Sequence, residues 1–423
     1  MDVSRSSTAP RSAVVVGAGI VGLSTAWFLQ DRGVHVTVVE RDEVGAGASW
    51  GNAGYLSPAL STPLTAPHVL GEGLRGLVDR GAPLSIPLRV DPRLWGFLLR
   101  FASHCRTGYW RRAVRHHLPL LEECLRAFDT LTADGVGAET HRAPVVAGFE
   151  SARAAAAMAR ELTGLQRLGA SVDFDELGRR EASSLRPQFS ERIAAAVRID
   201  GQRFLDPGRF VDQLAHSVVG RGACIHPRFA VTSIVAERDR VVVRPDAGPS
   251  VTADVAVVAT GAWLDDLGRS RGVRPRVRAG RGYSFHVPTD APVDGPIYLP
   301  GVRVACTPYQ DGLRIAGTME FRDIDEPVDL RRVDAIVDSV RPLIAGARWR
   351  ERGPAWVGAR PVTADALPVI GATRQPGVFV AGGHGMWGVT FGPVTGRLLA
   401  EHITTGKQPP ELAPFDPLRG RAG

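Results

Sequence analysis

Lysine is almost absent from this chain of 423 residues, because Lys407 is the single lysine among 51 basic residues. The formal net charge is +7, and acidic residues are interspersed with the arginines without any long basic tract. Proteins that bind nucleic acid usually gather their cations into a patch or stripe. The composition therefore argues against a nucleic-acid partner, and we attribute the arginine bias to a GC-rich genome.

Cysteine is also scarce, and the spacing of its four positions excludes the common metal sites. No CxxC pair or other metal-ligand spacing occurs, so we expect neither an iron–sulfur cluster nor a zinc site, and no metal. Four scattered cysteines suit a reducing compartment. They are Cys105, Cys124, Cys224 and Cys306.

Long hydrophobic runs are missing as well. No apolar segment approaches the roughly 20 residues of a membrane-spanning helix, and MDVSRSSTAPRSA at the N-terminus lacks the apolar region of a signal peptide. We therefore expect a cytoplasmic protein. The helical segment that ends at His117 mixes arginines with five aromatic residues, namely Trp95, Phe97, Phe101, Tyr109 and Trp110. It fits a core helix pair with solvated arginines, which we prefer, or peripheral contact with the anionic inner face of the cell membrane.

The stretch Ala13–Glu40 carries the strongest motif in the chain. A β-branched run precedes GxGxxG, a helical segment follows, and a second β-branched run ends at Glu40. This pattern predicts a strand, turn, helix and strand that bind a dinucleotide. Gly17 permits the turn, Gly19 admits the pyrophosphate, and Gly22 lets the helix pack closely. The helix N-terminus at Ile20 and Val21 offers N–H groups to the phosphates, and Glu40 suits a ribose diol.

A loop rich in small residues follows directly, RDEVGAGASWGNAGYLSPALS. It continues the dinucleotide unit, so we expect it to lie beside the helix N-terminus rather than to serve as a flexible connection. Its polar side chains and backbone N–H groups suit a pyrophosphate or the edge of a flavin. The candidates are Arg41, Ser49, Asn52, Ala53 and Gly54.

The remainder of the chain predicts two interleaved lobes, with no internal repeat and no low-complexity segment. Val231 lies in the first strand of a predicted hairpin, Ala230–Glu237 with Arg240–Pro245. The apolar strand Val255–Ala259 ends at Thr260 and Gly261, where we expect a cofactor to cross the carboxyl ends of a parallel sheet. Segments 275–287 and 297–318 alternate as antiparallel strands, and a helix from about Gly392 closes the chain.

Five motifs together resemble the FAD-dependent D-amino acid oxidase superfamily, and most closely its D-amino acid dehydrogenase branch. They occur in matching order over residues 12–403: the GxGxxG unit, SWGNAGYLSP, DGQRFLDPGRF, VVATGAW, and GARPVTADALPVIG followed by GGHGMWGVTFGP. The last motif departs from the GHG-x-x-G-W-T form of the dehydrogenases, which leaves the substrate open.

The resemblance implies an α/β fold with two domains. One is a discontinuous Rossmann-like FAD-binding domain of the GR2 type, and the other is a mixed-sheet α+β substrate domain. We place the FAD-binding domain at residues 1–75, 196–272 and 355–423. The substrate domain then comprises residues 76–195 and 273–354.

The resemblance also implies the site residues. Arg360 matches the arginine that holds the substrate carboxylate, a role that suits a planar guanidinium, with a structural salt bridge as the alternative. Tyr283 matches an active-site tyrosine, with core packing as the alternative, and His384 is either catalytic or structural. Tyr55 and Trp387 are expected to line the substrate pocket. The glycine-rich motif adds flavin contacts from Gly383, Gly385, Met386, Gly388, Val389 and Thr390.

We therefore expect an enzyme with non-covalent FAD that oxidises the C–N bond of a D-amino acid or a cyclic imino acid such as a D-proline. Hydride transfer to flavin would give an imine and then a 2-oxo acid, and the electron acceptor would be a quinone, an electron-transfer partner or O₂. One alternative is an O₂-using oxidase of glycine, sarcosine or other secondary amines. Another is a non-catalytic FAD-holding subunit of a hetero-oligomer. The sequence does not fix the oligomeric state.

Overall fold

A six-stranded sheet forms around β-branched runs that are buried on both faces in its central strands, as parallel strands require. The computed structural model describes residues 9–78, 82–87 and 89–420. The strand order is β10-β2-β1-β14-β21-β20, and only β20 runs antiparallel to its neighbour. The strands are β1 (Ser12–Val16), β2 (His35–Val39), β10 (Cys224–His226), β14 (Val255–Val258), β20 (Val369–Ala372) and β21 (Val378–Gly382).

Helices from distant parts of the chain pack against this sheet or against the helices that cover it. α1 and α10 pack closely at Gly396, because a Cβ there would lie 2.6 Å from the backbone of Ser24. Trp27 of α1 is fully buried and donates through Nε1 to Ser217 of α7 at 3.1 Å. The helices are α1 (Ile20–Asp31), α4 (Thr107–Ala133), α7 (Pro207–Gly220) and α10 (Gly388–Thr405).

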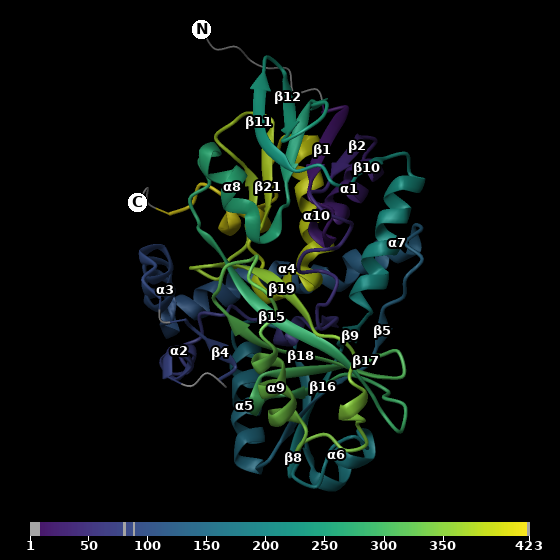
Figure 1. The fold of residues 1–423 in the computed structure, drawn as a ribbon, viewed down its shortest axis with the longest axis vertical. Coiled ribbons are helices and arrows are strands. Elements are labelled where there is room, and N and C mark those ends of the chain that lie inside the picture. Colours follow the sequence, from purple (N-terminus) through teal and green to yellow (C-terminus); the bar gives the residue numbers. More distant parts are fainter. Residues whose placement is uncertain (1–8, 79–81, 88, 421–423) are drawn as a thin grey trace.

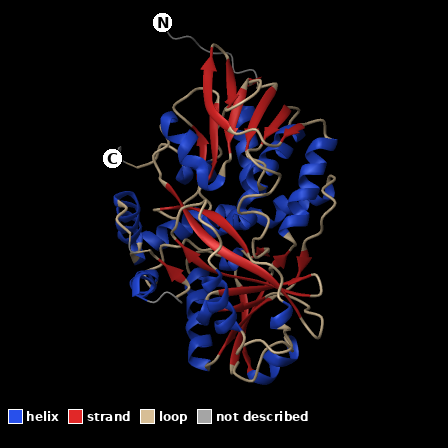
Figure 2. Ribbon diagram, viewed as in Figure 1, coloured by secondary structure: helices blue, strands red, loops and turns tan. Residues whose placement is uncertain are grey.

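A larger mixed sheet lies below the first in Figure 1, where strands and helices again form layers (Figure 2). Its order is β19-β15-β18-β17-β16-β6-β8-β7, and β4 pairs with β18 outside this path. The strands are β4 (Leu84–Ser85), β6 (Val145–Phe149), β7 (Asp173–Gly178), β8 (Ala195–Asp200), β15 (Val277–Pro288), β16 (Ile297–Leu299), β17 (Val304–Tyr309), β18 (Gly312–Glu320) and β19 (Trp356–Thr363).

Two three-stranded sheets and the remaining α-helices complete the structure. The sheets have the orders β11-β12-β13 and β3-β9-β5. Their strands are β3 (Tyr55–Leu56), β5 (His141–Arg142), β9 (Arg203–Phe204), β11 (Val231–Glu237), β12 (Arg240–Pro245) and β13 (Val251–Ala253). The other helices are α2 (Val69–Val78), α3 (Pro92–His104), α5 (Ala152–Gln166), α6 (Arg179–Leu185), α8 (Leu264–Gly268) and α9 (Leu330–Val340).

The aromatic segment of α3 and α4 packs largely into the protein. Phe97 is buried against Leu94 and Phe321, and Tyr109 donates its hydroxyl to the carbonyl of Asp365 at 3.2 Å. Leu99 is 71% exposed on α3. Among the described residues, no helix combines the length and the apolar character that crossing a bilayer requires. Peripheral membrane contact stays a prediction.

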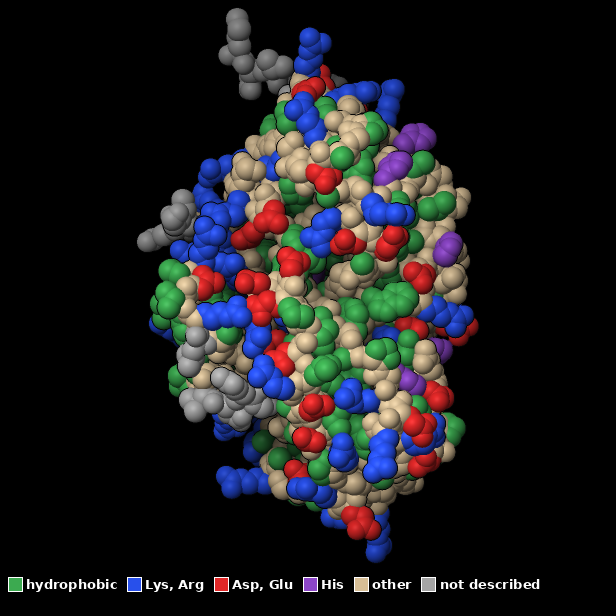
Figure 3. All heavy atoms as spheres, viewed as in Figure 1, with side chains coloured by type: hydrophobic (Ala, Val, Ile, Leu, Met, Phe, Trp, Pro, Cys, Tyr) green, Lys and Arg blue, Asp and Glu red, His purple; other side chains and the backbone are tan. Residues whose placement is uncertain are grey.

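The view in Figure 3 shows arginines and acidic side chains interspersed over this face, as the composition indicated. Segment 62–92 is rich in proline and glycine, yet it contains helix α2 and strand β4. β4 joins the larger sheet through the pairing of Met319 with Leu84, and α2 packs on β4, where a Cβ at Gly76 would lie 2.0 Å from the carbonyl oxygen of Leu84.

Candidate active site

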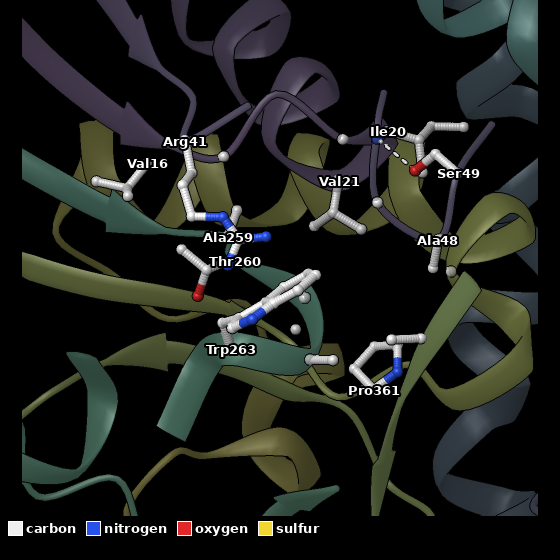
Figure 4. A pocket seen from close by; sticks show the side chains of 18 of the residues that line it. Val16, Ile20, Val21, Arg41, Ala48, Ser49, Ala259, Thr260, Trp263 and Pro361 are labelled. Atoms are coloured by element: carbon white, nitrogen blue, oxygen red, sulfur yellow. Dashed lines mark hydrogen bonds between the residues drawn. The ribbon is translucent and has the colours of Figure 1, made fainter. Parts of the chain in front are cut away.

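A cavity lies where β1, β14 and β21 end, at the carboxyl edge of the six-stranded sheet. Its other wall comes from Ala359, Arg360 and Pro361 of β19, which belong to the larger sheet. Figure 4 shows Pro361 across from Val21 of α1. The cavity therefore joins a parallel-sheet edge, where nucleotides bind, to a sheet that offers a second set of side chains.

The glycine-rich turn at one end of the cavity has the geometry that the motif predicts. Gly17 has φ +112°, and a Cβ there would lie 2.5 Å from the carbonyl oxygen of Ala259. A Cβ at Gly22 would lie 1.9 Å from the carbonyl oxygen of Gly17. Only glycine leaves room for this close packing of helix, strand and turn.

The N-terminus of α1 opens toward this space. The N–H of Ile20 donates to Ser49 Oγ at 3.1 Å, as Figure 4 shows. Ser49 thus ties the small-residue loop to the helix and leaves other N–H groups of the first turn directed toward the cavity. The loop and the helix form one cradle, as expected from their adjacency in the sequence.

Glu40 is held in place at the end of β2. Its Oε2 accepts from the N–H of Ala18 at 2.7 Å, and its Oε1 accepts from the N–H of Asp42 at 3.0 Å. These bonds fix a carboxylate on the cavity wall beside the glycine-rich turn. The same carboxylate also stabilises the turn itself, a role that the motif alone does not reveal.

Trp263 is a cavity residue that the sequence reading missed. The guanidinium carbon of Arg41 lies 4.1 Å from the centroid of its ring, and Figure 4 shows the two side chains together at the cavity. Such cation–π pairs hold an arginine in a defined position. The VVATGAW motif contained this tryptophan, but nothing in its local pattern separates a cavity residue from a core residue.

These features fit a bound dinucleotide. The turn packs so closely that Gly17 and Gly22 leave no room for a side chain. The helix N-terminus suits phosphates, and Glu40 suits a ribose diol. Thr260 adds a further sign, because its buried Oγ1 has no hydrogen-bond partner among the described residues and the residue lines the cavity. A buried hydroxyl without a partner is costly unless a ligand supplies one.

Arg360 lies at the other end of the cavity. Its Nη1 donates to the carbonyl oxygen of Thr318 at 2.6 Å, and no carboxylate of the described residues forms a salt bridge with it. Burial lowers the pKa of Arg360 to about 10. This value still leaves the guanidinium charged at neutral pH, so a desolvated cation without a counter-charge borders the cavity.

His384 also lines the cavity, but its chemistry is that of a neutral imidazole. Its Nε2 lies 3.0 Å from Thr395 Oγ1, and the side chain is buried. Burial lowers the pKa of His384 to about 3, with a smaller contribution from the nearby His117. An imidazole this weakly basic is poorly matched to general base catalysis near pH 7.

Three residues expected at the substrate lie outside the residues that line this cavity, because each uses its polar atom within the protein. Tyr283 is fully buried and donates its hydroxyl to Glu320 Oε2 at 2.8 Å. Tyr55 donates its hydroxyl to the carbonyl of Ile297 at 2.6 Å, and Trp387 donates Nε1 to the carbonyl of Thr62 at 2.9 Å. The geometry gives no support to substrate contacts by these three side chains.

Most other predicted site residues border the cavity. Those that line it are Gly17, Gly19, Ile20, Val21, Glu40, Arg41, Ser49, Asn52, Val231, Thr260, Gly261, Arg360, His384, Gly385, Met386, Gly388 and Val389. Those that do not are Gly22, Ala53, Gly54, Gly383 and Thr390, together with the three aromatic residues above. Lining residues without an earlier assignment include Ala46, Gly47, Phe229, Trp263, Asp266 and Pro361.

Known proteins resemble this chain over nearly its whole length. D-amino acid dehydrogenase from Xylella fastidiosa (strain M12) is 30% identical over 400 residues, which cover 92% of this chain and 91% of that protein. The enzyme of the same name from Methylobacterium radiotolerans is 30% identical over 417 residues, covering 96% of this chain and 99% of that protein.

Solved structures share the fold at lower identity. Glycine oxidase from Geobacillus kaustophilus superposes with a TM-score of 0.73 at 24% identity, covering 98% of this chain and 99% of that one. L-proline dehydrogenase from P. horikoshii superposes with a TM-score of 0.68 at 18% identity, covering 97% and 98%. A family model described as FAD dependent oxidoreductase matches residues 12–402. With the dinucleotide cradle and this match together, the chain belongs to the DAO family of FAD-dependent oxidoreductases.

Proposed function

We propose that this protein oxidises the C–N bond of an amino acid, and that its substrate is a D-amino acid or a cyclic imino acid such as a D-proline. The observation that carries the proposal is Arg360, a partly buried guanidinium on the cavity wall that pairs with no carboxylate of the described residues. An anionic group of the substrate would supply the missing charge, and a carboxylate matches the planar fork of arginine with two parallel hydrogen bonds. The relatives named D-amino acid dehydrogenase support the choice of substrate class.

FAD, when bound, would supply the chemistry of a two-electron acceptor for the hydride on the substrate Cα. The residues suited to hold it are the turn around Gly17, the N-terminus of α1, Glu40, Ser49 and Thr260. The N-terminus of α10, which begins at Gly388 on the cavity wall, offers a positive dipole end to developing negative charge. We propose that FAD is held without a covalent bond, because none of the cysteines lines the cavity.

The protein's own part in the reaction is to position the substrate and to stabilise charge. Arg360 would hold the carboxylate, so that a neutral amine lies in the cavity in a fixed orientation. Loss of hydride from Cα of the neutral amine leaves an iminium ion, the protonated form of the imine, and addition of water to it gives a 2-oxo acid and ammonium. These reaction steps need no side-chain base, which agrees with the low pKa of His384.

The same arginine speaks against a non-catalytic FAD-holding subunit, since holding a cofactor requires no cation at a second cavity wall. The electron acceptor is a quinone, another electron-transfer partner or O₂, and reoxidation of the reduced flavin by air or by a quinone distinguishes these. The cytoplasmic location of the protein and any contact with the inner face of the membrane stay predictions, and cell fractionation tests both. The division at residues 75, 195, 272 and 354 stays our proposal for the domain boundaries.

An anaerobic titration of the purified flavoprotein tests the proposal. D- and L-amino acids and both prolines are added in turn, and bleaching of the flavin absorbance identifies a substrate. We expect bleaching by D-amino acids or a proline, followed by reoxidation with either air or a quinone. Absence of bleaching by every amino acid would contradict the proposal and favour the subunit alternative.

A further inference from the structure

We propose that Gly282 is a positioning residue for Arg360. This inference rests on the proposed function, because Arg360 is taken to hold the substrate carboxylate. Arg360 belongs to β19 and pairs with Gly280 of β15. Its side chain reaches past β15 to the carbonyl of Thr318 on β18, the strand on the far side. The side chain therefore crosses one complete strand before its guanidinium reaches its hydrogen-bond partner.

The crossing takes place over Gly282. A Cβ built on this residue would lie 2.0 Å from Nη2 and 2.1 Å from Cζ of Arg360. Carbon and nitrogen atoms in contact need about 3.5 Å, so any side chain at 282 would move the guanidinium by more than 1 Å. The backbone at Gly282 does not itself require glycine, because its φ does not lie in the left-handed region. The three atoms nearest to such a Cβ all belong to the guanidinium of Arg360, so the arginine is the group that a side chain at 282 would displace first.

β18, the strand beyond Gly282, has an irregular backbone at the residue that binds the guanidinium. The register between β15 and β18 shifts between Arg281 and Tyr283, so Thr318 and Met319 together oppose Gly282. Thr318 has φ +60°, an uncommon conformation for a β-branched residue. Such a bulge redirects backbone groups and is often found beside active sites. Here it accompanies a carbonyl oxygen that accepts from Arg360 Nη1.

The bulge also marks the point where β18 changes partner. Gly317 is the last residue of β18 paired with β17 at Val304, and Met319 pairs with Leu84 of β4. Met319 also donates its N–H to the carbonyl of Pro83 at 2.7 Å. The conformation of Thr318 is thus fixed on both sides by strand pairing. Gly282 below the guanidinium and Thr318 at its tip together define one position for the cation.

The chain offers a matched control two residues away on the same face of β15. A Cβ at Gly280 would lie 2.9 Å from Val362 Cγ2 and 3.1 Å from Met319 Sδ, and the three atoms nearest to it all belong to these two side chains. Gly280→Ala therefore adds the same methyl group to the same strand, with its closest contacts on Val362 and Met319 rather than on the guanidinium. Any general cost of filling this face appears in both variants.

The experiment measures binding of pyruvate, the 2-oxo acid that oxidation of alanine would give, through the perturbation of flavin absorbance in each FAD-loaded protein. We expect Gly282→Ala to raise the Kd for pyruvate by about tenfold or more, because a displacement of about 1 Å is costly in a site of fixed geometry. Gly280→Ala should stay within about twofold. The KM for an amino acid substrate should rise in Gly282→Ala more than kcat falls, since the clamp acts on binding.

Arg360→Ala separates this inference from the function on which it rests. If Arg360→Ala weakens pyruvate and Gly282→Ala does not, the positioning role is overturned while the proposed function stands. If Arg360→Ala leaves pyruvate binding unchanged, both are overturned.

The double variant covers the case in which Gly282→Ala fails to fold. In the Arg360→Ala background the methyl group meets no guanidinium, so Gly282→Ala should add no further loss of thermal stability. Recovery of the folded protein only when the arginine is absent supports the inference. Failure to fold in both backgrounds would show that the glycine serves the backbone, and would overturn it.

Discussion

Replacement of Arg360 is the most direct perturbation of the candidate active site. Burial lowers the pKa of its guanidinium from 12.5 to about 10, so the charged form is destabilised there by about 3 kcal/mol when no anion is present. A bound carboxylate would relieve that cost and accept two hydrogen bonds. Truncating one partner of such a buried pair costs about 3–5 kcal/mol. We therefore expect Arg360→Ala to lower kcat/KM for the substrate by about two to four powers of ten.

The assay compares an amino acid with its amide, for example D-alanine with D-alaninamide if alanine is a substrate. The amide lacks the charge, so the native protein should strongly prefer the acid, and the Arg360→Ala protein should have lost most of that preference. Arg360→Lys should fall between the two, because an ammonium keeps the charge but cannot form two parallel bonds. FAD content should stay unchanged in both variants.

Arg352→Ala is a suitable control, since this arginine lies just before β19 and pairs with Asp334 at 3.4 Å near the surface. It should leave kcat/KM nearly unchanged. An Arg360→Ala protein that oxidises the acid normally would refute the reasoning. A colourless or unfolded Arg360→Ala protein would show that the residue is structural.

Three further predictions follow from the cavity. Acid precipitation should release the flavin into the supernatant, because Cys306 is fully buried in β17 and no cysteine lines the cavity; colour kept in the pellet would indicate a covalent bond. Glu40→Ala should weaken FAD binding by about 1.5–3 kcal/mol through loss of the hydrogen bonds between its carboxylate and the ribose diol, which flavin release on dilution measures. Glu43→Ala should not weaken FAD binding, because the carboxylate of Glu43 pairs with Arg228 at 3.7 Å. Burial lowers the pKa of His384 to about 3 and the pKa of His117 to about 4. As the pH falls below about 6.5, these histidines take up protons in the unfolded chain but stay neutral in the native protein. Urea unfolding should therefore show stability falling from pH 6.5 toward pH 4.5, with a shallower slope in His384→Asn; an unchanged slope in that variant would contradict the assignment.

The dinucleotide end of the site could be predicted from the sequence because its determinants are local. Gly22 packs on the carbonyl of Gly17 and Glu40 accepts from Ala18, all within a short unit of strand, turn and helix whose apolar period already places them. The contact of Gly17 with Ala259 is the exception, because it crosses to a distant strand. Trp263 could not be found in this way. Its position depends on a strand that pairs with β1 from more than 200 residues away, and on the Arg41 side chain that lies over its ring.

The substrate end depends on register, and the RGYS motif illustrates why a resemblance alone does not separate a cavity residue from a core residue. Successive residues of a strand point to opposite faces, so Tyr283 and Gly282 cannot both face Arg360. The pairing of β15 with β19 and β18 places Gly282 on the same face as the Arg360 guanidinium. Tyr283 lies on the opposite face, where its hydroxyl meets Glu320 in the core. A single sequence shows the alternation but not its phase, since a shift of one residue would exchange the two faces. The informative residue of the motif is therefore the glycine, whose missing side chain makes room for the cation.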